Sequence, residues 1–291
     1  MVGSASRPEK RKGDFMKATG RNRAAVLGAL LLVLSGCASV PITGRRQLNL
    51  VPDSLIRDMS YQQYGQFISQ NKLSTDAEQT AMVKRVGARI AKAVEQYCYE
   101  NGLADRVAGY QWEFNLVEDP NINAWALPGG KVVVYTGLLP IAQDEAGLAV
   151  VMGHEIAHVI ARHGAERMSQ GLLVEFGGMA LSKAIESKPA ATQQLFMRSY
   201  GLGAQVGFLL RYSRVQESEA DHLGLIFMAM AGYDPRAALG FWQRMATAKQ
   251  GPAPPEFLST HPADWRRIND IEKLLPEAMQ YYKPQEDSAA Q

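Results

Sequence analysis

Five consecutive residues near the middle of the chain, His154-Glu155-Ile156-Ala157-His158, match the pattern H-E-x-x-H. Because the two histidines are four positions apart, a helix would place both imidazoles on one face, where they can share one zinc ion. Glu155, next to the first histidine, can then act on a metal-bound water without binding the metal itself. The motif therefore predicts the chemistry of a zinc peptidase with Glu155 as a catalytic residue.

The residues around this motif favour a helix. The run from Asp144 to Ser169 contains no proline, and it starts with two acidic residues, which the free amides of a first helical turn favour. Its body is mostly apolar, as expected of a helix in a protein core. The alternative is a chance occurrence of the motif letters on a core helix, and this helical context favours the metal site over it.

Catalytic zinc needs a third protein ligand and an open position for water. The residue six positions after His158 is Gly164, and His163 lies one position too early, so the continuation that would supply a third histidine is missing. A carboxylate further along the chain is therefore expected as the third ligand. The segment 217–221, Glu-Ser-Glu-Ala-Asp, is the candidate, and it lies within a helical pattern over 212–230.

Within this helix, Glu217 and Asp221 share one face. We predict that Glu217 binds zinc and that Asp221 accepts a hydrogen bond from a ligand imidazole, which would fix its tautomer. Glu219 points elsewhere and is predicted to be a surface charge. A purely solvated acidic face is the alternative, and it is weakened by the apolar neighbours Ala220, Leu223, Leu225 and Ile226. His163 and His222 are predicted to form hydrogen bonds on helix faces.

The first 36 residues have the composition of an export signal. Seven Lys/Arg precede an apolar run of eleven residues, 24–34, which is too short to span a bilayer. The following Leu34-Ser35-Gly36-Cys37 resembles a bacterial lipobox, which predicts cleavage and lipidation at Cys37. Ala38 comes next, and similarity to Gram-negative lipoproteins then implies the periplasmic face of the outer membrane. The alternative is an ordinary secretory signal with an incidental cysteine. We also expect that Met16 is the true start, because counting from there gives a signal of ordinary length.

The charge and the cysteine content bear on possible nucleic-acid partners and on disulfide bonds. Subtracting the seven basic and two acidic residues of the signal from the 31 and 29 of the whole chain leaves a net charge of about −3. This balance gives no reason to expect a nucleic-acid partner. With Cys37 lipidated, Cys98 is the only remaining cysteine, so no internal disulfide is expected, and we interpret Cys98 as a packed apolar residue.

The remaining chain alternates between helical and strand patterns. Helices are predicted over 54–69, over 75–100 with Thr75 and Glu78 as a capping box, after Asp234-Pro235, and over 262–275. A half-buried strand is predicted over 110–116, and two more, 123–127 and 131–135, flank the turn Pro128-Gly129-Gly130 as a hairpin. The region 171–210 is helical with a break at 187–189, and either a mobile lid or a core hairpin fits it.

These patterns predict an α+β fold: a mostly helical, zincin-like metallopeptidase domain with a small antiparallel or mixed sheet beside the active-site helix. The expected organisation is a signal peptide over 1–36, a lipidated tether over 37–52, the metallopeptidase domain over 53–283 and a disordered tail over 284–291.

The chain resembles the prenyl-CAAX-endopeptidase superfamily of zinc metallopeptidases over about residues 40–275. It is most similar to the soluble branch, which contains periplasmic outer-membrane-assembly metalloproteases and the mitochondrial overlapping-activity metalloprotease. Besides H-E-x-x-H and 217–221, the resemblance rests on Pro41-Ile42-Thr43-Gly44-Arg45, Asn123-Ala124, Pro128-Gly129-Gly130, Thr136-Gly137-Leu138-Leu139 and Leu258-Ser259-Thr260-His261-Pro262. It departs from the integral-membrane members in lacking their transmembrane helices, and it has no C-terminal repeat domain.

The resemblance adds two expectations about the site. The sheet edge around Asn123, Ala124, Gly129 and Gly130 would bind the substrate as an added strand; a purely structural sheet is the alternative. His261 would either bind zinc as an extra ligand that keeps the enzyme latent or lie beside the cleft and stabilise the oxyanion. A structural role, with His261 capping the helix that follows, is the alternative.

Together these observations predict an endopeptidase with one Zn²⁺ per chain, held by His154, His158 and Glu217. The resemblance implies that its substrates are unfolded or stalled envelope proteins, degraded at the outer membrane as quality control. The alternative is a non-hydrolytic, chaperone-like assembly lipoprotein whose zinc is structural. Neither reading indicates an oligomeric state.

Overall fold

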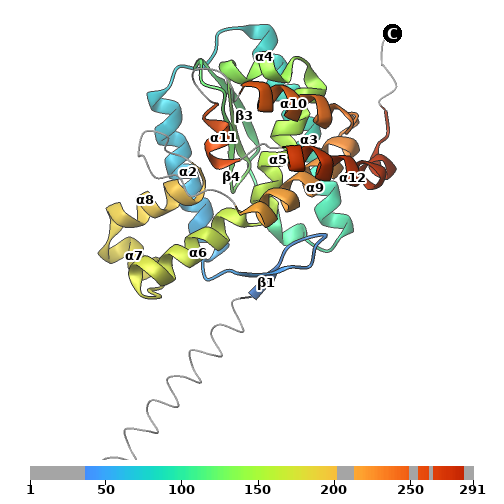
Figure 1. The fold of residues 1–291 in the computed structure, drawn as a ribbon. Coiled ribbons are helices and arrows are strands. Elements are labelled where there is room, and N and C mark those ends of the chain that lie inside the picture. Colours follow the sequence, from blue (N-terminus) through green and yellow to red (C-terminus); the bar gives the residue numbers. More distant parts are fainter. Residues whose placement is uncertain (1–36, 202–212, 249–254, 262–264, 285–291) are drawn as a thin grey trace, which may run out of the picture.

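The computed structural model describes residues 37–201, 213–248, 255–261 and 265–284. Helices make up most of the described chain, and two small sheets accompany them (Figure 1), which confirms the predicted α+β class. The predicted signal peptide over 1–36 and residues 285–291 of the predicted tail lie outside the described residues. None of the described helices combines the length and the apolarity needed to cross a membrane.

Helix α5 (Glu145–Ile160) carries the H-E-x-x-H motif and lies at the centre of the fold (Figure 1). Its first turn is capped by Asp144, whose side chain accepts a hydrogen bond from the backbone N of Gly147. Every residue from 147 to 160 is buried, because α5 packs against α3 (Ala77–Glu100), α9 (Arg214–Met230) and strand β4 (Ala124–Leu127). A helix that is covered on all sides is expected to be apolar all round, so its buried polar residues require partners.

The single helix predicted over 144–169 is wrong at one point. Helix α5 ends at Ile160, and α6 (His163–Phe176) starts three residues later. Between them Arg162 has a left-handed backbone with φ 60°, which ends the first helix and turns the chain. The guanidinium of Arg162 pairs with Asp53, the first residue of helix α2 (Asp53–Gln70). This turn brings His163 back against the end of α5.

The central sheet has the strand order β3-β5-β4. Strand β3 (Glu113–Val117) is parallel to β5 (Lys131–Tyr135), whereas β4 is antiparallel to β5, so the predicted hairpin is confirmed within a mixed sheet. The hairpin turn needs Gly129 and Gly130 because their φ angles are 96° and 85°, where other residues are strained. Strand β4 is an edge strand and packs beside α5.

Several of the other helices lie where the sequence predicts them. Helix α2 (Asp53–Gln70) agrees with the helix predicted over 54–69. Helix α3 is capped by Asp76, which accepts a hydrogen bond from the backbone N of Gln79, so the predicted Thr75 capping box is wrong. Short helix α4 (Leu139–Ala142) precedes α5, and α10 (Ala237–Ala248), α11 (Phe257–Thr260) and α12 (Trp265–Tyr281) follow α9.

Helices α7 (Leu181–Ser187) and α8 (Pro189–Ser199) confirm the predicted break between them. Helix α8 packs on α6, and Leu195 and Phe196 are fully buried in a second apolar cluster with Leu181 of α7. This packing supports the core-hairpin interpretation for 171–201. Residues 202–210, the rest of the predicted region, lie outside the described part of the chain.

The N-terminal hairpin consists of strands β1 (Cys37–Ser39) and β2 (Arg46–Leu48) and the turn between them. It lies against α6 and the end of α5: Gln47 Nε2 donates to the Ala161 carbonyl at 2.8 Å, and Ser169 Oγ accepts from the backbone N of Leu50 at 2.9 Å. Val40 of the turn belongs to the main apolar core. The segment predicted as a tether thus packs against the domain.

Candidate metal centre

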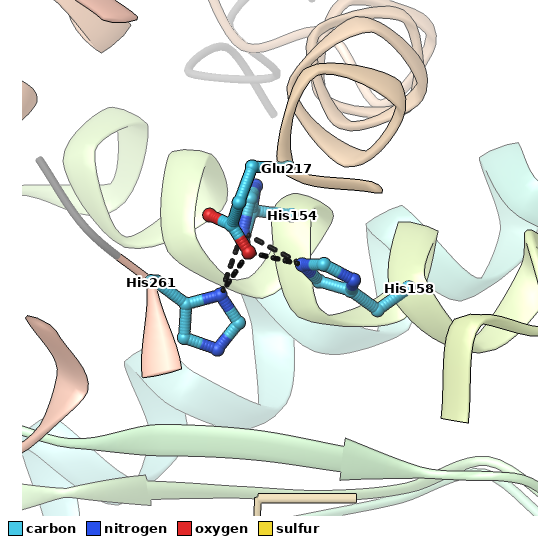
Figure 2. Close-up of side chains that lie close together, drawn as sticks. All are labelled: His154, His158, Glu217 and His261. Carbon is cyan, nitrogen blue, oxygen red and sulfur yellow. Dashed lines mark hydrogen bonds and ion pairs between the residues drawn. The ribbon is translucent and has the colours of Figure 1, made fainter. Parts of the chain in front are cut away.

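Four side chains converge beside α5 (Figure 2). His154 and His158 come from α5, Glu217 from the first turn of α9, and His261 follows α11 directly. One potential ligand atom from each residue lies within 4.8 Å of the others, and all four residues are buried. The structure therefore brings together the three predicted ligands and adds His261 to them.

The closest distances define which atoms face the common centre. The Nε2 atoms of His154 and His158 are 3.0 Å apart, and Glu217 Oε1 is 3.3 Å from His158 Nε2. His261 Nδ1 is 2.9 Å from Glu217 Oε1 and 3.2 Å from His154 Nε2. Both α5 imidazoles therefore point the same nitrogen inward, as the four-residue spacing predicts.

A contact between two glycines brings α9 close to α5. A Cβ atom on Gly224 would lie 2.9 Å from the backbone N of His154, and one on Gly153 would lie 2.9 Å from the carbonyl O of Gly224. Real Cβ atoms do not approach backbone atoms this closely, so a larger residue would push the helices apart. The glycines therefore set the distance between the histidines and Glu217.

The outward nitrogen of each α5 imidazole also has a partner. His154 Nδ1 lies 2.9 Å from Asp221 Oδ1, the contact predicted for Asp221. His158 Nδ1 lies 2.8 Å from His163 Nδ1, and His163 Nε2 lies 3.0 Å from Glu219 Oε2. Glu219 was predicted to be a surface charge, and this is wrong because the N-terminal hairpin covers that face of α9 and leaves its side chain 2% exposed.

Protonation of Glu219 at acidic pH should lower the free energy of unfolding. Burial acts to raise its pKa, but hydrogen bonds from His163, Arg45 and Thr43 lower the pKa to about 2 from the ordinary 4.5. Because the folded-state pKa is the lower one, this stabilisation is complete above pH 4.5 and is lost as the pH falls towards 2. Between these pH values, we expect the unfolding free energy of the wild type to fall by up to about 3 kcal/mol more than that of Glu219→Gln. Denaturant titrations of both proteins at pH 4.5 and at pH 2 measure these unfolding free energies. An equal loss of unfolding free energy in the wild type and in Glu219→Gln would contradict the prediction.

The protonation states suit a divalent metal. Burial lowers the pKa values of His154 and His158, which keeps both imidazoles neutral and able to donate a lone pair. Burial alone would raise the pKa of Glu217, but His261 and Arg267 bring it well below its usual value, so the carboxylate is ionised. Neutral imidazoles with a carboxylate are a usual donor set of catalytic zinc, and the residues present fit that ion.

Glu155 lies beside this cluster without belonging to it. Its side chain is buried, and Oε1 has no hydrogen-bond partner among the described residues, although His261 Nε2 is 3.4 Å away. Burial raises the pKa of Glu155 to about 7. A carboxylate with a pKa near the working pH can both take and return a proton, which is what a general base and acid requires.

Arg267 of α12 is a site residue that sequence reasoning missed. Its Nη1 lies 2.8 Å from Glu217 Oε2, and its Nη2 lies 2.7 Å from Asp221 Oδ1. The guanidinium also lies over the ring of Trp242, 3.4 Å from the centroid. The neighbouring Arg266 is exposed, so only the exact phase of α12 against α9, which is a tertiary feature, distinguishes the two arginines.

The predicted substrate edge lies along β4. Asn123 and Ala124 are at its start, and Gly129 and Gly130 form the turn after its other end. Asn123 Nδ2 donates to Glu256 Oε1 at 3.1 Å, and the backbone N of Phe257 donates to the Ile122 carbonyl at 3.1 Å. The segment that carries His261 is therefore attached to the start of this strand.

Comparison with known proteins places this site in a family. The sequence profile of peptidase family M48 matches residues 77–275, which include both helices of the metal cluster and His261. The chain belongs to peptidase family M48. A member of this family is expected to use a metal, and the buried cluster on α5 and α9 can hold one.

Named relatives agree with this assignment. The mitochondrial metalloendopeptidase OMA1 of Schizosaccharomyces pombe is 36% identical over 244 residues, covering 82% of this chain and 66% of the relative. OMA1 of Saccharomyces cerevisiae is 31% identical over 280 residues, covering 89% and 77%. A putative beta-barrel assembly-enhancing protease of Vibrio cholerae is 36% identical over 164 residues, covering 54% and 33%. The predicted family is confirmed, and these names support the predicted class of metalloendopeptidase.

Proposed function

We propose that this M48 member is a zinc-dependent endopeptidase that degrades unfolded or misassembled proteins of the cell envelope at the outer membrane. The observation that supports hydrolysis most directly is the pairing of a buried donor set with the separate carboxylate of Glu155, which is buried beside it with Oε1 3.4 Å from His261 Nε2. A purely structural metal does not require a carboxylate with a pKa near neutrality beside its ligands. The alternative is an assembly lipoprotein with a structural zinc.

The residues divide the chemistry among themselves. His154, His158 and Glu217 would hold zinc, which when bound lowers the pKa of water and polarises a carbonyl. Glu155 would take the proton of the attacking water and return it to the leaving amine. Asp221 would hold His154 by its outward nitrogen, and the edge of β4 would align an extended substrate.

Two features support the envelope location. The lipobox-like sequence before Cys37 predicts a lipid anchor. One relative is named for enhancing β-barrel assembly, whereas the OMA1 relatives are mitochondrial. The resemblance of residues 34–37 to a bacterial lipobox favours the outer membrane for this chain.

Removal of the metal tests the proposed hydrolysis. We expect the purified chain to cut casein and a misfolded β-barrel protein into fragments, to stop when a chelator is added, and to recover with Zn²⁺. Gel electrophoresis and mass spectrometry of the fragments measure this. Binding of the same substrates without fragments, with or without zinc, would instead support the chaperone alternative.

His261 occupies a fourth position of the cluster, and we propose that it keeps the enzyme latent. Its Nδ1 approaches both Glu217 and His154, where the water of a catalytic site would be needed. His261→Ala should therefore raise the initial rate of casein cleavage several-fold at saturating zinc. A large fall in kcat at unchanged zinc content would contradict latency and favour the oxyanion role.

A further inference from the structure

The second imidazole of the motif is held by a hydrogen-bonded chain that leads out to the N-terminal hairpin. We propose that Arg45 of this hairpin is a positioning residue of the metal site, acting through Glu219 and His163 on His158. The proposal rests on the proposed function, because it assumes that His158 binds the metal. It assigns a role to the Pro-Ile-Thr-Gly-Arg segment beyond anchoring the chain.

Each residue of this hydrogen-bonded series lies within hydrogen-bond distance of the next one. His158 Nδ1 lies 2.8 Å from His163 Nδ1, and His163 Nε2 lies 3.0 Å from Glu219 Oε2. Arg45 Nε donates to Glu219 Oε1 at 2.9 Å, and Thr43 Oγ1 donates to the same oxygen at 2.7 Å. His163 is fully buried and Glu219 nearly so, and solvent therefore does not replace these partners.

Binding of a metal by His158 would fix the direction of each hydrogen bond in this series. If His158 binds through Nε2, its proton must be on Nδ1, which donates to His163. His163 must then accept on Nδ1 and carry its own proton on Nε2, which donates to the ionised Glu219. Each link permits only one direction, so the position of the Glu219 carboxylate fixes the tautomer and the ring orientation of both histidines.

Arg45 offsets the repulsion between Glu219 and a second carboxylate close by, that of Glu166. The guanidinium binds Glu166 through Nη1 and Nη2, both at 2.8 Å, while it also binds Glu219. One cation therefore joins two buried acids that would otherwise repel each other. At His154 the partner is Asp221 of α9, which is in turn bound by Arg267 of α12. His158 depends on α6, α9 and the hairpin together.

The experiment measures zinc affinity of the purified full chain by competition with a chromophoric chelator. Glu219→Leu removes the acceptor of His163 and should weaken zinc binding about 10- to 100-fold. Glu219→Gln keeps an amide oxygen for His163 and should lie between Leu and the wild type. Arg45→Met leaves the carboxylate and both imidazoles in place and should weaken binding by a smaller factor. The visible absorption of bound Co²⁺ should change in Glu219→Leu, since one ligand ring is no longer oriented.

Glu145→Gln is the matched control. Glu145 lies on the same helix as His158, at its opposite end, and forms ion pairs with Arg85 and Arg89. The Gln variant loses these ion pairs away from the metal cluster, so its zinc affinity should equal that of the wild type. Wild-type affinity in folded Arg45→Met would overturn the inference and leave the proposed function intact, and so would wild-type affinity in folded Glu219→Leu. A wild-type chain that binds no zinc would instead overturn the proposed function.

Discussion

Replacing Glu155 with glutamine should lower kcat/KM for peptide cleavage by about 10²- to 10⁴-fold. The amide cannot accept the proton of the attacking water, and it cannot return a proton to the leaving amine. The ligand atoms of His154, His158 and Glu217 are untouched, so the variant should still bind zinc. Cleavage of an unstructured fluorogenic peptide and the zinc content of the same preparation are the two measurements.

Glu155→Asp provides a graded comparison for this prediction. It retains a carboxylate but shortens its reach by one methylene, and part of the activity should remain. A Glu155→Gln protein that cleaves as fast as the wild type would refute the assignment of Glu155 as the base. If the Gln variant lost its zinc, its inactivity would show a structural role for Glu155.

Gly224→Ala should separate the two halves of the metal site. The new Cβ would lie 2.9 Å from the backbone N and 3.0 Å from the Cα of His154, and neither backbone atom can rotate away. Overpacking of this kind costs about 1–3 kcal/mol of unfolding free energy. Because α9 also carries Glu217, the displaced helix should bind zinc more weakly as well. Thermal unfolding with and without zinc tests both effects.

Gly65→Ala is the control for Gly224→Ala. Gly65 lies in helix α2, and a Cβ atom there would meet no atom within 4 Å. Alanine at this exposed position should therefore stabilise the helix by about 0.5–1 kcal/mol and leave zinc affinity unchanged. If Gly224→Ala also left both quantities unchanged, the glycine contact would not set the ligand spacing.

Local patterns predicted the parts of the site that a single helix determines. The spacing of His154 and His158, and of Glu217 and Asp221, depends only on helical geometry, and the structure places these residues as predicted. The hairpin around Gly129 and Gly130 was equally local, since its turn demands glycine. The resemblance supplied His261, which no spacing within its own segment could place.

Long-range packing decided the rest. Arg267 and Glu219 look like ordinary surface charges in the sequence, because their burial depends on which distant element covers them. The break falls at Arg162, which has a left-handed backbone although it is neither glycine nor asparagine, the residues that usually adopt it. Arg45 was part of a recognised segment, yet its contacts reach residues more than a hundred positions away.

The direct contact of Gly153 with Gly224 has an entropic consequence. At most interfaces between helices, interdigitating side chains set the spacing of the two backbones, and those side chains lose rotamer freedom when the helices pack. Here backbone meets backbone, and the separation has no rotameric freedom. An arriving ion therefore finds its donors preorganised and loses little conformational entropy in gathering them, which leaves more of the coordination energy as affinity.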